Sequence, residues 1–161
     1  MDEAMKRATV ERPSERELVV RRIVRGPARL VFAAWTRAEL FEQWWVPAAA
    51  PITLRSCQLD VRVGGTYRLV FGVDGSDQEM AFFGRYLEVV PNRRIVWTND
   101  EDGEGEGAVS TVTFDEENGH TLVVVHDLYP SKEALDAAIE SGSTEGMPAQ
   151  LEQLDALVSE L

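Results

Sequence analysis

The chain has 161 residues, a length that suits one domain with a substantial hydrophobic core. Its 28 acidic residues outweigh 16 Lys and Arg residues, and the resulting formal charge of −12 argues against nucleic acid or an anionic membrane as a partner. The single cysteine, Cys57, cannot form an intrachain disulfide, and the sequence contains no signal-peptide pattern and no apolar run long enough to span a bilayer. We therefore expect a cytoplasmic protein.

The N-terminal region divides into two parts. Residues 1–15 are rich in charge and carry no hydrophobic period, so we expect a flexible tail followed by a single domain over residues 16–161. Residues 17–26 are rich in Val and Ile and alternate in part, which predicts a strand.

Two short helices are predicted after this strand. Pro27 suits the first position of a helix that continues to Trp35, because its missing N–H costs little there. Thr36 and Glu39 have the spacing of a capping box, which predicts a second helix beginning at Thr36. Pro47 ends that helix, since the residue before a proline avoids the helical region.

The middle of the chain reads as strands joined by short turns, which predicts one antiparallel sheet of about six to seven strands, including the first. The predicted strands in this region are residues 52–63, 66–73, 79–90, 93–99, 108–114 and 120–128.

Two helices are predicted at the C-terminal end. Ser131 can cap a helix over residues 132–140, and Thr144 can cap the long final helix. The final helix carries an apolar stripe of Met147, Leu151, Leu154, Val158 and Leu161. A curled sheet could bury this stripe on its concave face, while the helices before and after the sheet close the ends of a cavity. This is an α+β arrangement.

Several motifs in this order resemble one known family, the homologues of the activator of the heat-shock protein 90 ATPase. They are "VRRIVRGPARLVFAAWTRAELFEQWWVP" at 20–47, "VGGTYR" at 63–68, "GRYLEVVPNRRIVWT" at 84–98, "GHTLVVVH" at 119–126 and "EGMPAQLEQLDALVSEL" at 145–161. The family belongs to the START-like (SRPBCC, birch-pollen-allergen-like) superfamily. The resemblance implies a helix-grip fold, in which an antiparallel sheet curls around a long C-terminal helix and leaves a cavity. Met147 departs from the pattern, because many members have Trp there.

The resemblance does not imply one settled function, so three hypotheses stand. We favour binding of a small hydrophobic or aromatic molecule, without catalysis. The first alternative is an enzyme of the polyketide cyclase or hydrolase type, with His126 or a tyrosine as the acid–base group. The second is an interaction module that modulates a chaperone ATPase. The sequence also leaves homodimerisation open.

No motif indicates a metal or another cofactor. The two histidines, His120 and His126, and the lone cysteine do not form a ligand cluster. No spacing demands a catalytic triad, so we assign no catalytic residue.

The candidate cavity residues are large apolar side chains, some of which carry a polar atom. They are Trp45, Tyr67, Leu69, Phe71, Phe82, Tyr86, Trp97, Phe114, His126, Met147 and Leu151. Helical spacing places Trp45 beside Phe41. We therefore expect Trp45 to face the cavity and Trp44 to be partly exposed at its rim.

Overall fold

The computed structural model describes residues 8–100, 107–141 and 144–161. The strands are β1 (Thr9–Ser14), β2 (Glu17–Val24), β3 (Ile52–Leu59), β4 (Thr66–Val73), β5 (Glu79–Val90), β6 (Arg94–Thr98), β7 (Val109–Glu117) and β8 (His120–Leu128). The helices are α1 (Ala28–Thr36), α2 (Ala38–Phe41), α3 (Lys132–Glu140) and α4 (Gly146–Ser159).

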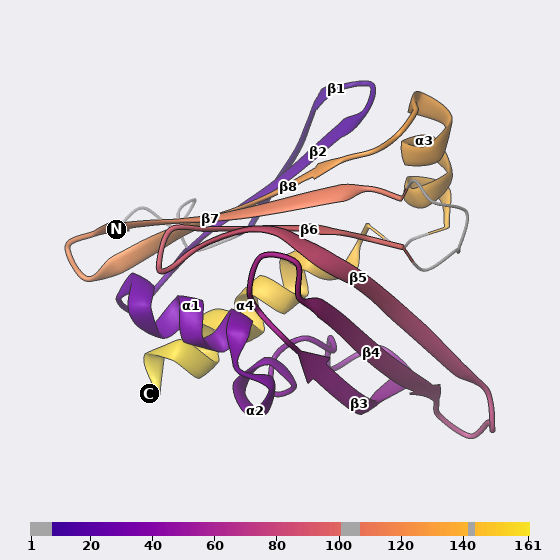
Figure 1. Cartoon of the computed structure of the whole chain (residues 1–161), viewed down its shortest axis with the longest axis horizontal. Helices are drawn as coiled ribbons and strands as arrows, with labels where there is room; N and C mark the ends of the chain where they lie inside the picture. The colour runs from indigo at the N-terminus through magenta and orange to yellow at the C-terminus, as the bar shows by residue number, and fades with distance from the viewer. Residues whose placement is uncertain (1–7, 101–106, 142–143) are drawn as a thin grey trace.

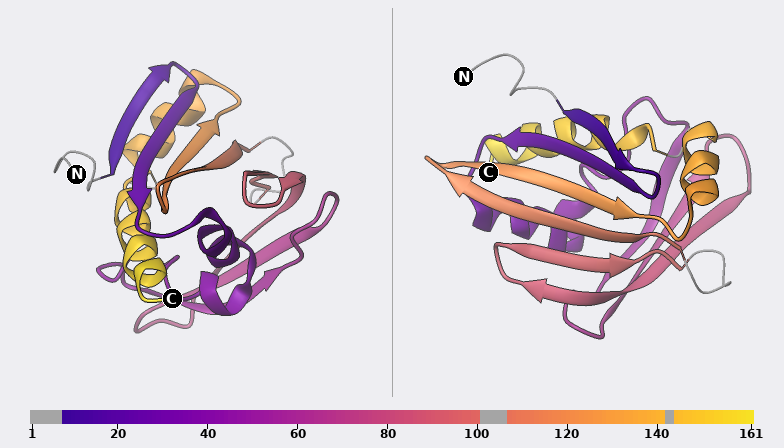
Figure 2. Two further views of the ribbon diagram at one scale, coloured as in Figure 1. Left: turned by 90° about the vertical axis from the view of Figure 1, so that its left-hand side faces the viewer. Right: turned by 90° about the horizontal axis from the view of Figure 1, so that it is seen from above.

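All eight strands belong to one antiparallel sheet with the order β1-β2-β8-β7-β6-β5-β4-β3. The sheet twists and curls, and α1, α2 and α4 lie on its hollow side (Figures 1 and 2). Helix α3 lies at one end of the sheet, beyond the end of β8. The α+β helix-grip fold predicted from the sequence is confirmed.

The strand count differs from the prediction because part of the supposed tail forms β1. Residues 9–14 pair with β2 at the edge of the sheet, so the assignment of residues 1–15 to a flexible tail is wrong for them. All six residues of β1 are exposed, and they include charged residues and Pro13. Such an edge strand is joined mainly through its backbone and therefore shows no hydrophobic period. Residues 1–7 lie outside the described residues.

Of the three predicted N-cap residues, only Ser131 caps its helix, which is α3. The Ser131 hydroxyl accepts a hydrogen bond from the Ala134 N–H at 3.0 Å, as expected for an N-cap. Thr36 instead ends α1 and donates its hydroxyl to the Phe32 carbonyl at 2.8 Å. Thr144 does not cap α4, which follows Glu145 without a side-chain cap.

A buried ion pair ties α4 to β2. Asp155 is 5% exposed and contacts the guanidinium of Arg22, which is 8% exposed, at 3.2 Å. Asp155 also accepts the backbone N–H of Arg25 at 2.8 Å. Asp155 follows Leu151 by four residues and precedes Val158 by three, so it lies at the edge of the apolar stripe and is buried with it. The tether therefore fixes the helix that closes the hollow side of the sheet.

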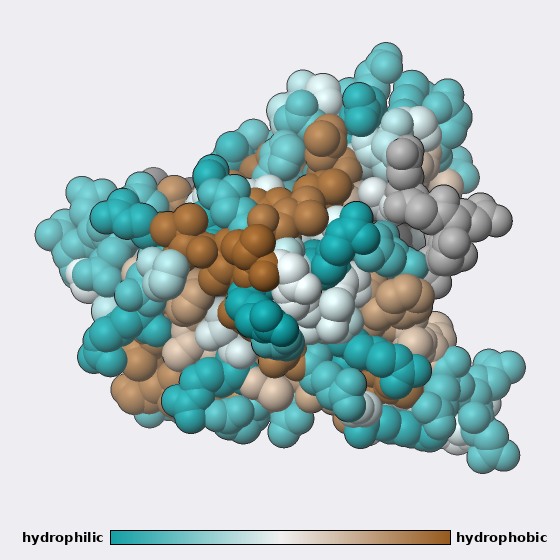
Figure 3. Space-filling view, in the orientation of Figure 1, coloured by the Kyte–Doolittle hydropathy of each residue, from teal (hydrophilic) through white to brown (hydrophobic). Residues whose placement is uncertain are grey.

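The exposed residues include large hydrophobic side chains such as Val63 and Leu87, despite the formal charge of −12. Figure 3 shows hydrophilic residues around the periphery of one face and a band of hydrophobic residues across its centre.

Candidate functional site

A cavity of about 1020 Å³ lies between the concave face of the sheet and helices α3 and α4. Aromatic and aliphatic side chains form most of its wall. Packing normally leaves few voids larger than a water molecule, whereas binding pockets have volumes of about 300–1,000 Å³. The space therefore has the size and chemical character of a binding pocket.

Most of the residues predicted from the sequence line this cavity. They are Trp45, Tyr67, Leu69, Phe71, Phe82, Tyr86, Trp97 and Met147. Neighbouring strands β4, β5 and β6 supply most of them, because the inward-facing residues of adjacent strands fall side by side. Their role in binding stays a prediction.

Three predicted residues lie elsewhere. Phe114 is buried in the core, where its ring packs edge-on against Phe32 with centroids 5.9 Å apart. Leu151 is fully buried in the same core. His126 points to the outer face of the sheet, where its Nε2 lies 3.0 Å from the Glu17 carboxylate.

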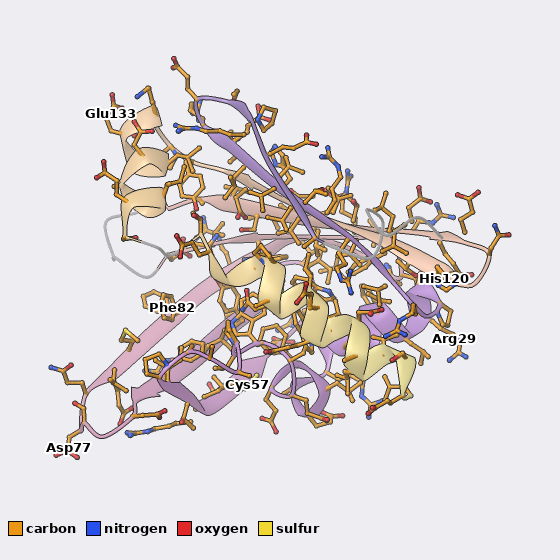
Figure 4. All side chains as sticks on the ribbon, turned by 180° about the vertical axis from the view of Figure 1, so that it is seen from behind. Arg29, Cys57, Asp77, Phe82, His120 and Glu133 are labelled. Atoms are coloured by element: carbon orange, nitrogen blue, oxygen red, sulfur yellow. The ribbon has the colours of Figure 1, made fainter. Side chains whose placement is uncertain are left out.

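His126 was predicted to face the cavity because the even-numbered residues of β8 were assigned to the wrong face of the sheet. Thr121, Val123 and Val125 are the buried residues of β8, so the even-numbered residues face outward. The sequence could not decide this, because both faces of β8 are apolar. The other histidine is also remote, since Figure 4 shows His120 at the opposite end of the molecule from Glu133 on α3.

The two adjacent tryptophans have separate roles. Trp45 lines the cavity and stacks on Phe41 with centroids 4.6 Å apart, as predicted. Trp44 is fully buried rather than exposed, and its indole N–H donates to the Ala34 carbonyl at 2.9 Å. The ring of Trp44 packs instead against Trp35 and Phe41, with centroids 4.7 and 5.4 Å apart, and these contacts bury it.

Glutamines of α4 hold the segment that follows these tryptophans. The Gln153 side-chain amide donates to the carbonyls of Trp44 and Val46 at 2.9 and 2.8 Å. Gln150, which itself lines the cavity, donates to the Trp45 carbonyl. The final helix therefore positions the Trp45 side of the cavity wall.

A polar group that the sequence analysis missed lies in the cavity wall near α3. The Asp127 carboxylate accepts a 2.6 Å hydrogen bond from the Ser110 hydroxyl. Ser110 in turn accepts from the Asn99 side-chain amide at 3.1 Å, and that amide also donates to the Ala108 carbonyl at 2.7 Å. A possible signal was the parity of β8, since Asp127 follows Val123 and Val125 on the inward face.

Burial alters the acidity of three groups. Desolvation raises the pKa of Asp127, although the Ser110 hydrogen bond opposes this effect. Asp127 as a whole residue is partly exposed, and it lines the cavity. Desolvation also raises the pKa of Tyr86, and it raises the pKa of the Cys57 thiol to about 11. Tyr86 therefore offers the cavity a neutral phenol.

Two further findings concern the described residues alone. They contain no group of three or more His, Cys, Asp or Glu side chains arranged to hold a metal ion. None of their helices is both long and apolar enough to cross a membrane.

Comparison with known proteins identifies the family of this chain. The family model described as "Activator of Hsp90 ATPase homolog 1-like protein" matches residues 25–159. The chain belongs to this family. No curated protein matches the chain.

Solved structures of several proteins share the fold of this chain. A protein from Chromobacterium violaceum is 31% identical, with a TM-score of 0.73 over 88% of this chain and 96% of that one. A protein from Nitrosomonas europaea is 23% identical, with a TM-score of 0.81 over 92% and 97% of the two chains. An AHSA1-like protein from Aeromonas hydrophila is 17% identical, with a TM-score of 0.70 over 89% and 92%. The last two likenesses concern the fold alone.

Proposed function

We propose that this AHSA1-like domain binds a small hydrophobic or aromatic molecule in the cavity between its sheet and α4. The observation that carries the proposal is the cavity of about 1020 Å³ with its aromatic wall. An apolar ligand would displace water from this wall and fill contacts that the protein leaves unmade. Trp45, Trp97 and Tyr86 offer flat apolar surfaces together with polar edges that can orient the ligand.

A binding screen with a matched pair of variants tests the proposal. A panel of hydrophobic and aromatic compounds is first screened by thermal shift. A ligand present at a hundredfold excess over its Kd adds about 2.7 kcal/mol of stability. The Ala138→Phe variant places a ring in the cavity wall and should abolish binding. Ala156→Phe makes the same change at an exposed position of α4 and should leave binding intact.

Two results would contradict the proposal. One is a broad panel without any stabilising ligand. The other is equal binding by the Ala138→Phe variant, which would place the ligand outside the cavity.

The enzyme alternative loses the histidine on which it was based, because His126 lies on the outer face of the sheet. A tyrosine remains available to that hypothesis in the cavity wall. The chaperone-modulating alternative stays a prediction. An ATPase assay with the host chaperone tests it, and an unchanged rate would contradict it.

A further inference from the structure

One row of side chains crosses the cavity wall from β8 to β5. The strand registers pair Asp127 with Ser110, Ser110 with Trp97, and Trp97 with Tyr86. All four residues line the cavity. Directly opposed residues on one face have Cβ atoms about 4.5–5.5 Å apart, so Asp127 and Trp97 flank Ser110 on either side.

The hydrogen bonds around Ser110 leave Asp127 able to accept another donor. The Ser110 hydroxyl is directed at Asp127 because Asn99 donates to the Ser110 oxygen from the other side. Ser110 bonds only one of the two carboxylate oxygens, and no other described residue donates to this side chain. A buried carboxylate gains substantially from a second, charged donor.

Among the described residues, the charged side chains of the cavity wall are all acidic. Asp127 and Asp100 are its charged side chains, and no Lys, Arg or His lines it. Asp100, the second carboxylate, accepts the Thr98 hydroxyl at 2.8 Å but is not part of the row that contains Trp97. The whole chain adds to this field with its formal charge of −12. An anionic ligand would meet repulsion, whereas a cation would be attracted.

The aromatic side of the wall suits a cation as well. Trp97 lies across Ser110 from Asp127, and its ring centroid is 5.7 Å from that of Trp35. A cation within about 6 Å of an indole ring is stabilised by its negative face, and more so away from water. Beyond these rings, the wall continues with aliphatic and aromatic side chains that can receive an apolar body.

From this arrangement we infer that the cavity selects hydrophobic amines. The protonated nitrogen donates to Asp127 and contacts the Trp97 ring. The apolar body extends toward Trp45 and Phe82. This inference rests on the proposed function and specifies its ligand class.

Three probes with one apolar body and different head groups test the inference. They are 4-phenylbutan-1-amine, 4-phenylbutan-1-ol and 4-phenylbutanoic acid, whose binding is measured by calorimetry at pH 7. Alkylamines are protonated at this pH, with a pKa of about 10.4 as in lysine. An ammonium forms a stronger hydrogen bond with a carboxylate than a hydroxyl does. We therefore expect the amine to bind about tenfold to a hundredfold more tightly than the alcohol. The acid should bind most weakly.

A matched pair of variants tests whether Asp127 causes the preference for the amine. Asp127→Asn should bring the affinity for the amine down to that for the alcohol, with little change for the alcohol. Asp100→Asn makes the same chemical change at the other carboxylate of the wall and should keep the preference for the amine. Circular dichroism and thermal melting verify that each variant is folded. The comparison of probes on the unmodified protein needs no variant and stands if Asp127→Asn does not fold.

The outcomes separate this inference from the proposed function. If the alcohol or the acid binds as tightly as the amine, the cavity binds apolar molecules but the inference is overturned. The same holds if Asp127→Asn retains the preference for the amine. If none of the three probes binds at millimolar concentration while other compounds of the screening panel do, the inference is overturned and the proposed function stands. If the whole panel fails as well, both are overturned.

Discussion

Removal of the Asp155 carboxylate should strongly destabilise the protein, because it would leave a buried cation without a counter-ion. The Arg22 side chain is 9% exposed, and its Nε and Nη1 atoms already lack hydrogen-bond partners among the described residues. In Asp155→Ala its remaining ion pair disappears. Breaking a buried pair on one side costs about 3–5 kcal/mol, a large part of the roughly 5–15 kcal/mol that stabilises a typical domain. The exposed partner Arg25 should contribute much less, about 0–1 kcal/mol.

Urea denaturation measures these losses by linear extrapolation, with circular dichroism and tryptophan fluorescence as independent probes. The Arg22→Met and Asp155→Leu double variant removes both charges and keeps apolar volume between β2 and α4. It should recover most of the stability that Asp155→Ala loses. The reasoning is refuted if Asp155→Ala costs less than about 1 kcal/mol, or if the double variant is as unstable as the single one.

Four smaller predictions concern individual side chains. Burial raises the pKa of Asp127 in the folded protein above its unfolded-state pKa of about 3.9. Native stability therefore falls as the pH rises from the unfolded-state pKa through the folded-state pKa. Over that range Asp127→Asn should gain stability relative to the unmodified protein. Parallel melting curves from pH 4 to 8 would contradict this. Cys57, with a pKa of about 11, should react far more slowly with Ellman's reagent at pH 8 than free cysteine, and unfolding should remove the difference. Trp44→Phe loses the bond to the Ala34 carbonyl and should cost about 1–3 kcal/mol in urea denaturation, whereas an unchanged midpoint would count against that bond. Gly84→Ala would place Cβ 2.0 Å from the Thr98 carbonyl oxygen and should cost about 1–3 kcal/mol in urea denaturation, whereas an unchanged midpoint would contradict this steric argument.

Local sequence patterns predicted most of the elements. Strands β4, β5 and β8 begin and end at the predicted residues, because turn residues flank each one. The cap at Ser131 was predictable for a similar reason, since its partner lies only three residues away. In contrast, β1 consists of exposed residues and depends on a neighbouring strand for its pairing.

Strand β4 has one distinct face, so its part of the candidate site was predictable from the sequence. Tyr67, Leu69 and Phe71 alternate with other residues on β4, and all three line the cavity. On β8 the apolar residues occupy both faces, so choosing the wrong face exchanged His126 for Asp127. The hydrogen bond from Ser110 to Asp127 depends on the register between two strands, which a single sequence does not specify.

The position of α4 in the chain also determines when the cavity can form during synthesis. The glutamines of α4 bond to backbone carbonyls that precede them by 105–109 residues. A chain still emerging from the ribosome therefore lacks the helix that closes the binding space, even after every strand has been made. Contacts of such long sequence separation also form slowly. The binding proposed for this cavity therefore needs α4 in place, and a chain shortened before Gly146 would leave its aromatic wall open to water and to other unfolded chains.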